Sequence, residues 1–138
     1  MSAMRWRLWT WAALLALPGV LGCGEPPPKL VTARGKILFR NRPLAGALVK
    51  LVPDPADGKQ GFAAHGTTDH DGVFFLQTYP HGDGAVPGTY KVTIRSGACC
   101  EGERPVTIPA KYADLSKTPL EVRVTDSGLE PAELKLVP

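Results

Sequence analysis

Metal binding is the first chemistry that the side-chain types suggest. The three histidines fall within seventeen residues, among three aspartates: His65, His70, His81, Asp69, Asp71 and Asp83. Imidazole and carboxylate groups bind zinc, but a zinc site needs three or four of them to converge on one point. His70 lies at the expected tip of a turn and His65 lies on a strand some distance away. We therefore expect exposed turn and loop histidines and no metal site.

The segment Asp69-His70-Asp71-Gly72 begins like a calcium-binding loop. The later oxygen ligands and the terminal glutamate of an EF-hand do not follow it. The same residues suit a tight turn, because aspartate carboxylates accept hydrogen bonds from nearby backbone amides and glycine tolerates positive φ. The expected role of Asp69, Asp71 and Gly72 is therefore structural, and no cofactor is expected.

Thiol chemistry depends on three cysteines, Cys23, Cys99 and Cys100. Cys99 and Cys100 are adjacent, so they cannot link distant strands. No histidine has a recognisable catalytic spacing to either thiol, and both lie in a glycine-containing loop. A free pair and a local disulfide between neighbours both remain open, and we expect no catalytic residues and no enzyme activity.

Three aromatic residues near the loops, Phe75, Tyr79 and Tyr112, are the candidate ligand contacts. Exposed aromatic rings can form a platform for a sugar or a peptide. The alternative is ordinary packing of the loops over the core. Glycan binding requires these rings to be exposed, so their burial separates the two interpretations.

Residues 1–22 are expected to be an export signal. Arg5 and Arg7 precede an apolar run, Leu8–Leu17, which is about half the length that a membrane-spanning helix needs. The run ends in Val20-Leu21-Gly22-Cys23, which resembles the bacterial lipobox. The resemblance implies that lipid is attached to the thiol of Cys23, that the chain is cleaved before it, and that the acyl chains hold the protein in a membrane.

Residues 23–29 form the lipidated cysteine and a tether rich in proline, which favours an extended polyproline II conformation. The absence of aspartate at Gly24 weakly favours the outer membrane. We expect an exported protein at the cell envelope, at the outer membrane or the periplasmic face. Without Arg5 and Arg7, 14 basic residues remain against 13 acidic ones. This balance, without a basic run interleaved with aromatics, argues against nucleic acid as a partner.

Residues 30–138 are expected to form a single β-domain. The chain has 138 residues with 15 glycines and 14 prolines, a composition of many turns and few helices. In Thr89–Arg95, alternation predicts that Tyr90, Val92 and Ile94 face the core and that the residues between them, including Thr93, face solvent. The fold class is all-β, a seven-stranded antiparallel Greek-key β-sandwich. The expected strands are Leu30–Arg40, Ala47–Val52, Phe62–Thr68, Val73–Thr78, Thr89–Arg95, Leu120–Thr125 and Leu134–Leu136.

The order of motifs in residues 30–138 resembles the carboxypeptidase regulatory-like domain, a transthyretin-like (prealbumin-like) sandwich found in many short bacterial lipoproteins. The segments that carry the resemblance are Gly35–Ile37, Arg42–Val49, Thr68–Phe74, Gly82–Val92 and Ile108–Tyr112. The resemblance implies an accessory domain that is structural, adhesive, or binds proteins or carbohydrates. The expected function is a non-catalytic structural or protein-interaction module of the envelope, with a carbohydrate-binding module as the alternative. The partner is therefore an envelope protein or a glycan.

Overall fold

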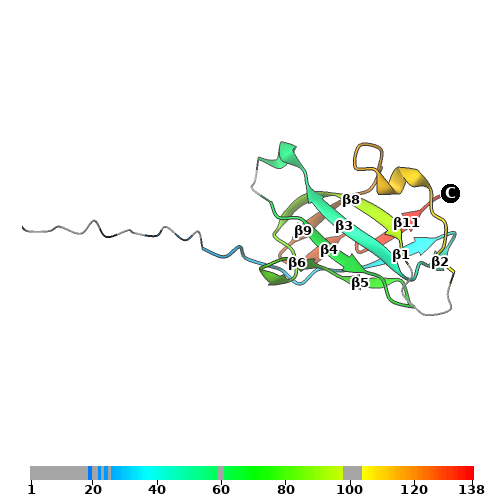
Figure 1. The fold of residues 1–138 in the computed structure, drawn as a ribbon, viewed down its shortest axis with the longest axis horizontal. Coiled ribbons are helices and arrows are strands. Elements are labelled where there is room, and N and C mark those ends of the chain that lie inside the picture. The colour runs from blue at the N-terminus through cyan, green and yellow to red at the C-terminus, as the bar shows by residue number, and fades with distance from the viewer. Residues whose placement is uncertain (1–18, 20–21, 23, 25, 59–60, 98–103) are drawn as a thin grey trace, which may run out of the picture.

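The computed structural model describes residues 19, 22, 24, 26–58, 61–97 and 104–138. Cys23, the pair Cys99 and Cys100, and nearly all of the expected export signal lie outside the described residues. Residues 26–30 contain no helix or strand. In Figure 1 they leave the folded domain on the side opposite the C-terminus.

The folded domain is an all-β sandwich of two sheets, as the sequence predicts (Figure 1). Short 3-10 turns, η1 (Pro55–Asp57) and η2 (Ala110–Ala113), are the helical elements of the described residues. The strands are β1 (Arg34–Phe39), β2 (Arg42–Pro43), β3 (Ala47–Pro53), β4 (Ala64–Thr67), β5 (Val73–Phe75), β6 (Gln77–Thr78), β7 (Gly82–Asp83), β8 (Gly88–Ser96), β9 (Glu121–Thr125), β10 (Gly128–Glu130) and β11 (Glu133–Leu136).

The larger sheet has seven strands in the order β10-β9-β8-β3-β4-β6-β7, with antiparallel neighbours. Its longest ladder joins β3 and β8, from the pair Ala47 and Ser96 to the pair Pro53 and Tyr90. This ladder fixes which residues share a face, because side chains alternate between the two faces along each strand.

The smaller sheet departs from the wholly antiparallel expectation. β1 pairs in parallel with β11, with Lys36 opposite Glu133 and Phe39 opposite Leu136. The other edge of β1 pairs antiparallel with β5 and with β2. Alternation within a strand shows which face is buried but not which strand lies alongside, so the direction of this pair had no local signal.

The expected strand Val73–Thr78 is divided between the two sheets at Leu76. β5 belongs to the smaller sheet and β6 to the larger one. Leu76 itself donates its N–H to the Ala33 carbonyl (2.9 Å) and accepts from the Gly84 N–H (2.7 Å). This division and the short strands β2, β7 and β10 explain why the structure has more strands than the seven expected.

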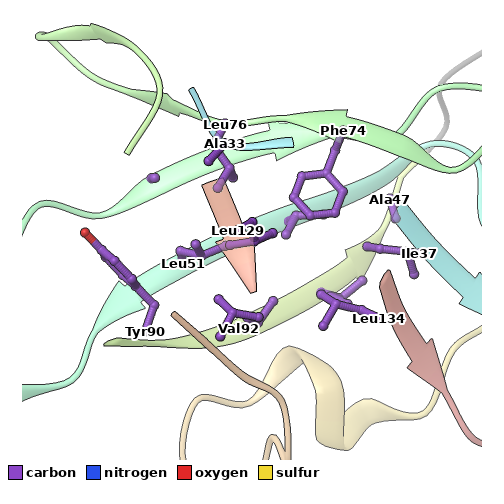
Figure 2. Close-up of a cluster of buried hydrophobic side chains, with 14 of the residues drawn as sticks. Ala33, Ile37, Ala47, Leu51, Phe74, Leu76, Tyr90, Val92, Leu129 and Leu134 are labelled. Carbon is purple, nitrogen blue, oxygen red and sulfur yellow. The ribbon is translucent and has the colours of Figure 1, made fainter. Parts of the chain in front are cut away.

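The core lies between the sheets and is filled from both sides (Figure 2). The predicted inward residues of β8, Tyr90, Val92 and Ile94, are all buried. They belong to one buried cluster with Ile37 of β1 and Leu134 of β11, and Figure 2 labels Tyr90 and Val92 in this cluster. The larger sheet buries its inner face in this core and leaves its other face outward.

Thr93 corrects one detail of the expected alternation. It faces outward, yet it is only 8% exposed. The segment around η2 covers this part of β8, and the Thr118 hydroxyl donates to the Val92 carbonyl (2.7 Å). The outer face of the larger sheet therefore has a covered part and an open part.

Candidate functional site

A groove of about 810 Å³ runs along the outer face of the larger sheet, beside η2. Figure 1 shows η2 in gold next to β8, which it contacts. The volume lies within the range of about 300–1,000 Å³ that is usual for ligand sites. The groove is lined by Leu48, Val49, Lys50, Val52, His65, Thr93, Arg95, Ala113, Asp114 and Leu115.

The floor of the groove comes from alternate residues of three neighbouring strands. In register, Lys50 of β3 lies between His65 of β4 and Thr93 of β8, and Leu48 lies opposite Arg95. Directly opposed residues have Cβ atoms about 4.5–5.5 Å apart, and diagonal neighbours about 7–8 Å. Lys50 and Arg95 are therefore diagonal neighbours on one face, with His65 beside Lys50.

The aliphatic part of the groove is exposed on both sides. Leu48 is 51% exposed on the sheet, and Leu115 is also exposed on the segment that follows η2. Val52 adds a half-buried side chain to the floor. The groove therefore offers apolar surface together with charged groups, which is typical of a binding site that recognises both.

The wall opposite the sheet is formed by a tight turn that Asp114 organises. Its Oδ1 accepts the backbone N–H of Ser116 (2.9 Å) and the Ser116 hydroxyl (2.7 Å), while Lys117 Nζ lies 3.7 Å from Oδ2. The two hydrogen bonds from Ser116 lower the pKa of the Asp114 carboxyl, and the Lys117 charge adds to them. Asp114 is thus a fixed negative charge whose bonding is already supplied by its own turn.

Lys50 and Arg95 have no such partner. Among the described residues, no carboxylate lies within ion-pair distance of either side chain. By contrast, Lys91, on the same face of β8, has Glu121 of β9 opposite it. Two cations at this spacing repel each other, and a bound anion would offset the repulsion.

A second, smaller depression of about 190 Å³ adjoins the groove at His65. Gln77 Nε2 donates to Asp83 Oδ1 at 3.0 Å on its floor. Tyr79, 83% exposed, lies at its rim. The side chains here can donate and accept hydrogen bonds next to a free aromatic ring.

The structure separates the three candidate aromatics. Phe75 is 58% exposed, with the Arg34 guanidinium 5.7 Å from its ring centre. Tyr112 is 1% exposed and belongs to the core, so it is not a ligand contact. Its position in a loop-rich stretch gave no sign of burial, because the covering segment is irregular and has no alternation to read. The three-ring platform is therefore wrong, and Tyr79 lines the depression beside His65.

The Asp69 turn takes the geometry of a backbone cap. Asp69 Oδ1 accepts the N–H groups of Asp71 and Val73, both at 2.9 Å. Gly72 has φ 74°, and an added Cβ there would lie 2.6 Å from the Ile37 carbonyl oxygen. Asp71 contributes its backbone N–H, and its carboxylate makes no hydrogen bond within the described part of the chain, so the capping expected of both carboxylates comes from Asp69.

The histidines occupy different places. His65 is on β4, His70 is at the tip of the Asp69 turn, and His81 packs edge-on against Phe62 with ring centres 4.7 Å apart. Within the described ranges, no three His, Cys, Asp or Glu residues are grouped so that they could hold a metal ion.

The groove residues Leu48, Lys50, Arg95 and Leu115 were not selected from the sequence. One signal was present: Ala47–Val52 places an aliphatic residue, Leu48, on the face that also carries Lys50. A strand with one solvated face usually shows polar residues there. The wall at Leu115 had no such signal, because it depends on how residues 108–118 fold over β8.

Searches against family models, curated proteins and solved structures found no match to this chain. In the part of the chain that the structure describes, no helix has the length and apolar character needed to cross a membrane.

Proposed function

We propose that this protein is an exported lipoprotein of the cell envelope, held in a membrane by lipid on Cys23, whose sandwich acts as a non-catalytic protein-interaction module. The observation that carries the interaction role is the groove with exposed Leu48 and Leu115 beside the unpaired cations Lys50 and Arg95. These groups are suited to binding, and their exposure in the folded domain makes them available to a partner.

The anchor part of the proposal rests on the lipobox-like segment Val20–Cys23 and the prolines that follow it. The folded domain begins near Val31, which exchanges two backbone hydrogen bonds with Ala85, each 2.9 Å. Pro26 and Pro27 before it are exposed. An extended segment between Cys23 and the sandwich lets the domain stand clear of the lipid surface.

The sequence resemblance to the carboxypeptidase regulatory-like domain supports the same role, since domains of that type are mostly accessory. The two-sheet fold is compatible with it. A fold alone does not assign a function, so the proposal depends on the groove.

Fractionation of cells tests the anchor. The unchanged chain is expected in the membrane fraction, and Cys23→Ser in the soluble fraction with its export signal uncleaved or released without lipid. The matched control is the double variant Cys99→Ser with Cys100→Ser, which also removes thiols but should stay in the membrane. Equal membrane retention of Cys23→Ser and the control would refute lipid anchoring.

Site-specific crosslinking tests the interaction role. A photo-reactive residue replaces Leu48 in the groove in one strain and Lys135, on the smaller sheet, in another. Irradiation of intact cells should give a discrete protein adduct from position 48 and none from position 135. Absence of an adduct at position 48, or the same adducts at both positions, would contradict the proposal.

Carbohydrate binding is the second candidate function, and the depression beside Tyr79 favours it. Sugar rings pack on exposed aromatic rings while their hydroxyls bond polar side chains, here Gln77 and Asp83. A glycan array should then show binding that Tyr79→Ala abolishes and Phe75→Ala retains. Binding unaffected by Tyr79→Ala would exclude this depression as the sugar site.

A further inference from the structure

The outer groove carries more information about its occupant than its existence alone. Three properties of the groove bear on its ligand: the sign of the unpaired charge, the kind of apolar surface, and the position of the opposing carboxylate. Each restricts the chemistry of the ligand, and together they select one class.

The unpaired charge is positive and lies on the sheet side. Lys50 and Arg95 are diagonal neighbours, and the carboxylate nearest in the groove, on Asp114, is held by Ser116 and Lys117 on the opposite wall. An arginine guanidinium and a lysine ammonium side by side bind carboxylates and phosphates through charge-assisted hydrogen bonds. The ligand must therefore bring an anion to the sheet side.

The apolar surface of the groove is aliphatic. Leu48, Val52 and Leu115 line it, and its lining residues include no Phe, Tyr or Trp. Glycans are usually held by stacking on aromatic rings, and the exposed ring of Tyr79 lines the neighbouring depression, not this groove. A peptide supplies aliphatic side chains to match this surface, so the groove suits a peptide better than a sugar.

Asp114 gives the groove a direction. Its fixed negative charge repels an acidic group on the η2 side, while Lys50 and Arg95 attract one on the sheet side. Repulsion on one wall and attraction on the other set the orientation in which an acidic partner can bind. A single acidic side chain flanked by aliphatic ones satisfies both walls at once.

We propose that the groove binds an extended acidic peptide segment of a partner protein, with a carboxylate between Lys50 and Arg95 and aliphatic side chains on Leu48 and Leu115. This inference rests on the proposed interaction function and names the chemistry of the partner at the same groove. The carboxylate compensates two neighbouring cations that have no ion-pair partner among the residues that the structure describes.

The test uses the purified full chain in detergent and a short fluorescent peptide of alternating leucine and aspartate. The peptide is expected to bind saturably, with affinity that falls as salt is raised because exposed charges are screened. A peptide of alternating leucine and asparagine has nearly the same shape without the charge, and it should bind at least tenfold more weakly. Equal binding of the two peptides would overturn the proposal.

Four variants place the binding in the groove. Lys50→Glu and Arg95→Glu should each lower the affinity for the acidic peptide at least tenfold. Asp114→Asn, which keeps an acceptor oxygen for the Ser116 bonds, should raise this affinity. Arg42→Glu, an equal charge reversal on exposed β2 of the smaller sheet, should leave the affinity unchanged. If Arg42→Glu weakens binding as much as Lys50→Glu, the attraction is general and the groove is not the site.

The same variants separate this inference from other occupants and from the proposed function. Vesicles containing phosphatidylglycerol and an oligosaccharide of uronic acids are assayed alongside the peptides. Groove-dependent binding of either one, without peptide binding, would assign the cations to lipid or to glycan and overturn the peptide. A crosslinked protein adduct at position 48 with no acidic-peptide binding would keep the interaction function and reject only the acidic chemistry. Thermal melting of each variant, together with the neutral change Lys50→Gln, shows whether lost binding comes from lost folding.

Discussion

The Tyr112 hydroxyl joins the η2 segment to the strand end at Val137 through both backbone groups of that residue. The Val137 N–H donates to Tyr112 Oη (2.9 Å), and Tyr112 Oη donates to the Val137 carbonyl (3.1 Å). One phenol therefore satisfies both backbone hydrogen-bonding groups of the residue that follows β11. The same contact holds the segment that forms the outer wall of the groove.

Removing this hydroxyl should loosen the domain without emptying its core. Tyr112→Phe keeps the buried ring and is expected to lower the free energy of unfolding by about 1 kcal/mol, the usual contribution of a hydrogen bond. Tyr79→Phe is the control, because exposed substitutions stay within about 0.5 kcal/mol. Urea unfolding of both variants measures the difference, and equal values would show that the Val137 contacts do not stabilise the fold.

The two aspartates of the Gly72 turn should differ. Asp69→Ala removes an acceptor of two backbone N–H groups and should destabilise the domain by about 1–2 kcal/mol. Asp71→Ala should stay within about 0.5 kcal/mol. Millimolar calcium should leave the melting curve of the unchanged chain in place, since a ligand of the folded state would raise stability. A calcium-dependent rise that Asp71→Ala abolishes would make this turn a metal site.

Gly72 and Gly58 share positive φ but not their surroundings. Gly58→Ala meets open space, so it should cost only the left-handed conformation, about 1–2 kcal/mol. Gly72→Ala should cost clearly more, because its Cβ would meet the Ile37 carbonyl oxygen at 2.6 Å and the Leu44 nitrogen at 3.1 Å. Thermal denaturation compares the two, and a similar loss in both would show that the β1–β2 turn yields to the added methyl.

The core of β8 should respond to the loss of side-chain volume. Val92 is buried, and Val92→Ala leaves a cavity that should cost about 1–3 kcal/mol. Lys91→Ala, its neighbour on the outer face, should change the free energy of unfolding by about 0.5 kcal/mol or less. Chemical denaturation measures both, and similar costs would contradict the assignment of the two faces.

Alkaline pH should destabilise the domain through Tyr90. Burial raises the pKa of this phenol, and the nearby Asp57 charge raises it further. The folded state therefore holds its proton more tightly than the unfolded state, so stability is full below the unfolded pKa of about 10 and falls as pH rises through the folded pKa. Tyr90→Phe should weaken this decline, although it also loses the 2.6 Å bond to the Val86 carbonyl. An identical alkaline slope in the variant would remove Tyr90 as its cause.

Residue types along single strands predicted the part of this structure that depends on local alternation. The buried set Tyr90, Val92 and Ile94 and the positive φ of Gly72 belong to that part. The burial of Thr93 and Tyr112 was missed, because both depend on an irregular segment that crosses β8. The groove was missed for the same reason: its two walls come from segments that meet only in the folded chain.

The parallel pair of β1 and β11 sets the order in which this domain can assemble. Ile37 and Leu134, opposite each other in that pair, lie almost a whole domain apart in sequence, so this pair cannot form until nearly all of residues 30–138 are available. Contacts between such distant residues slow folding, because chain entropy is lost before the contact is made. While residues 133–136 are still being synthesised, β1 can pair only with β2 and β5, so β11 joins the smaller sheet late.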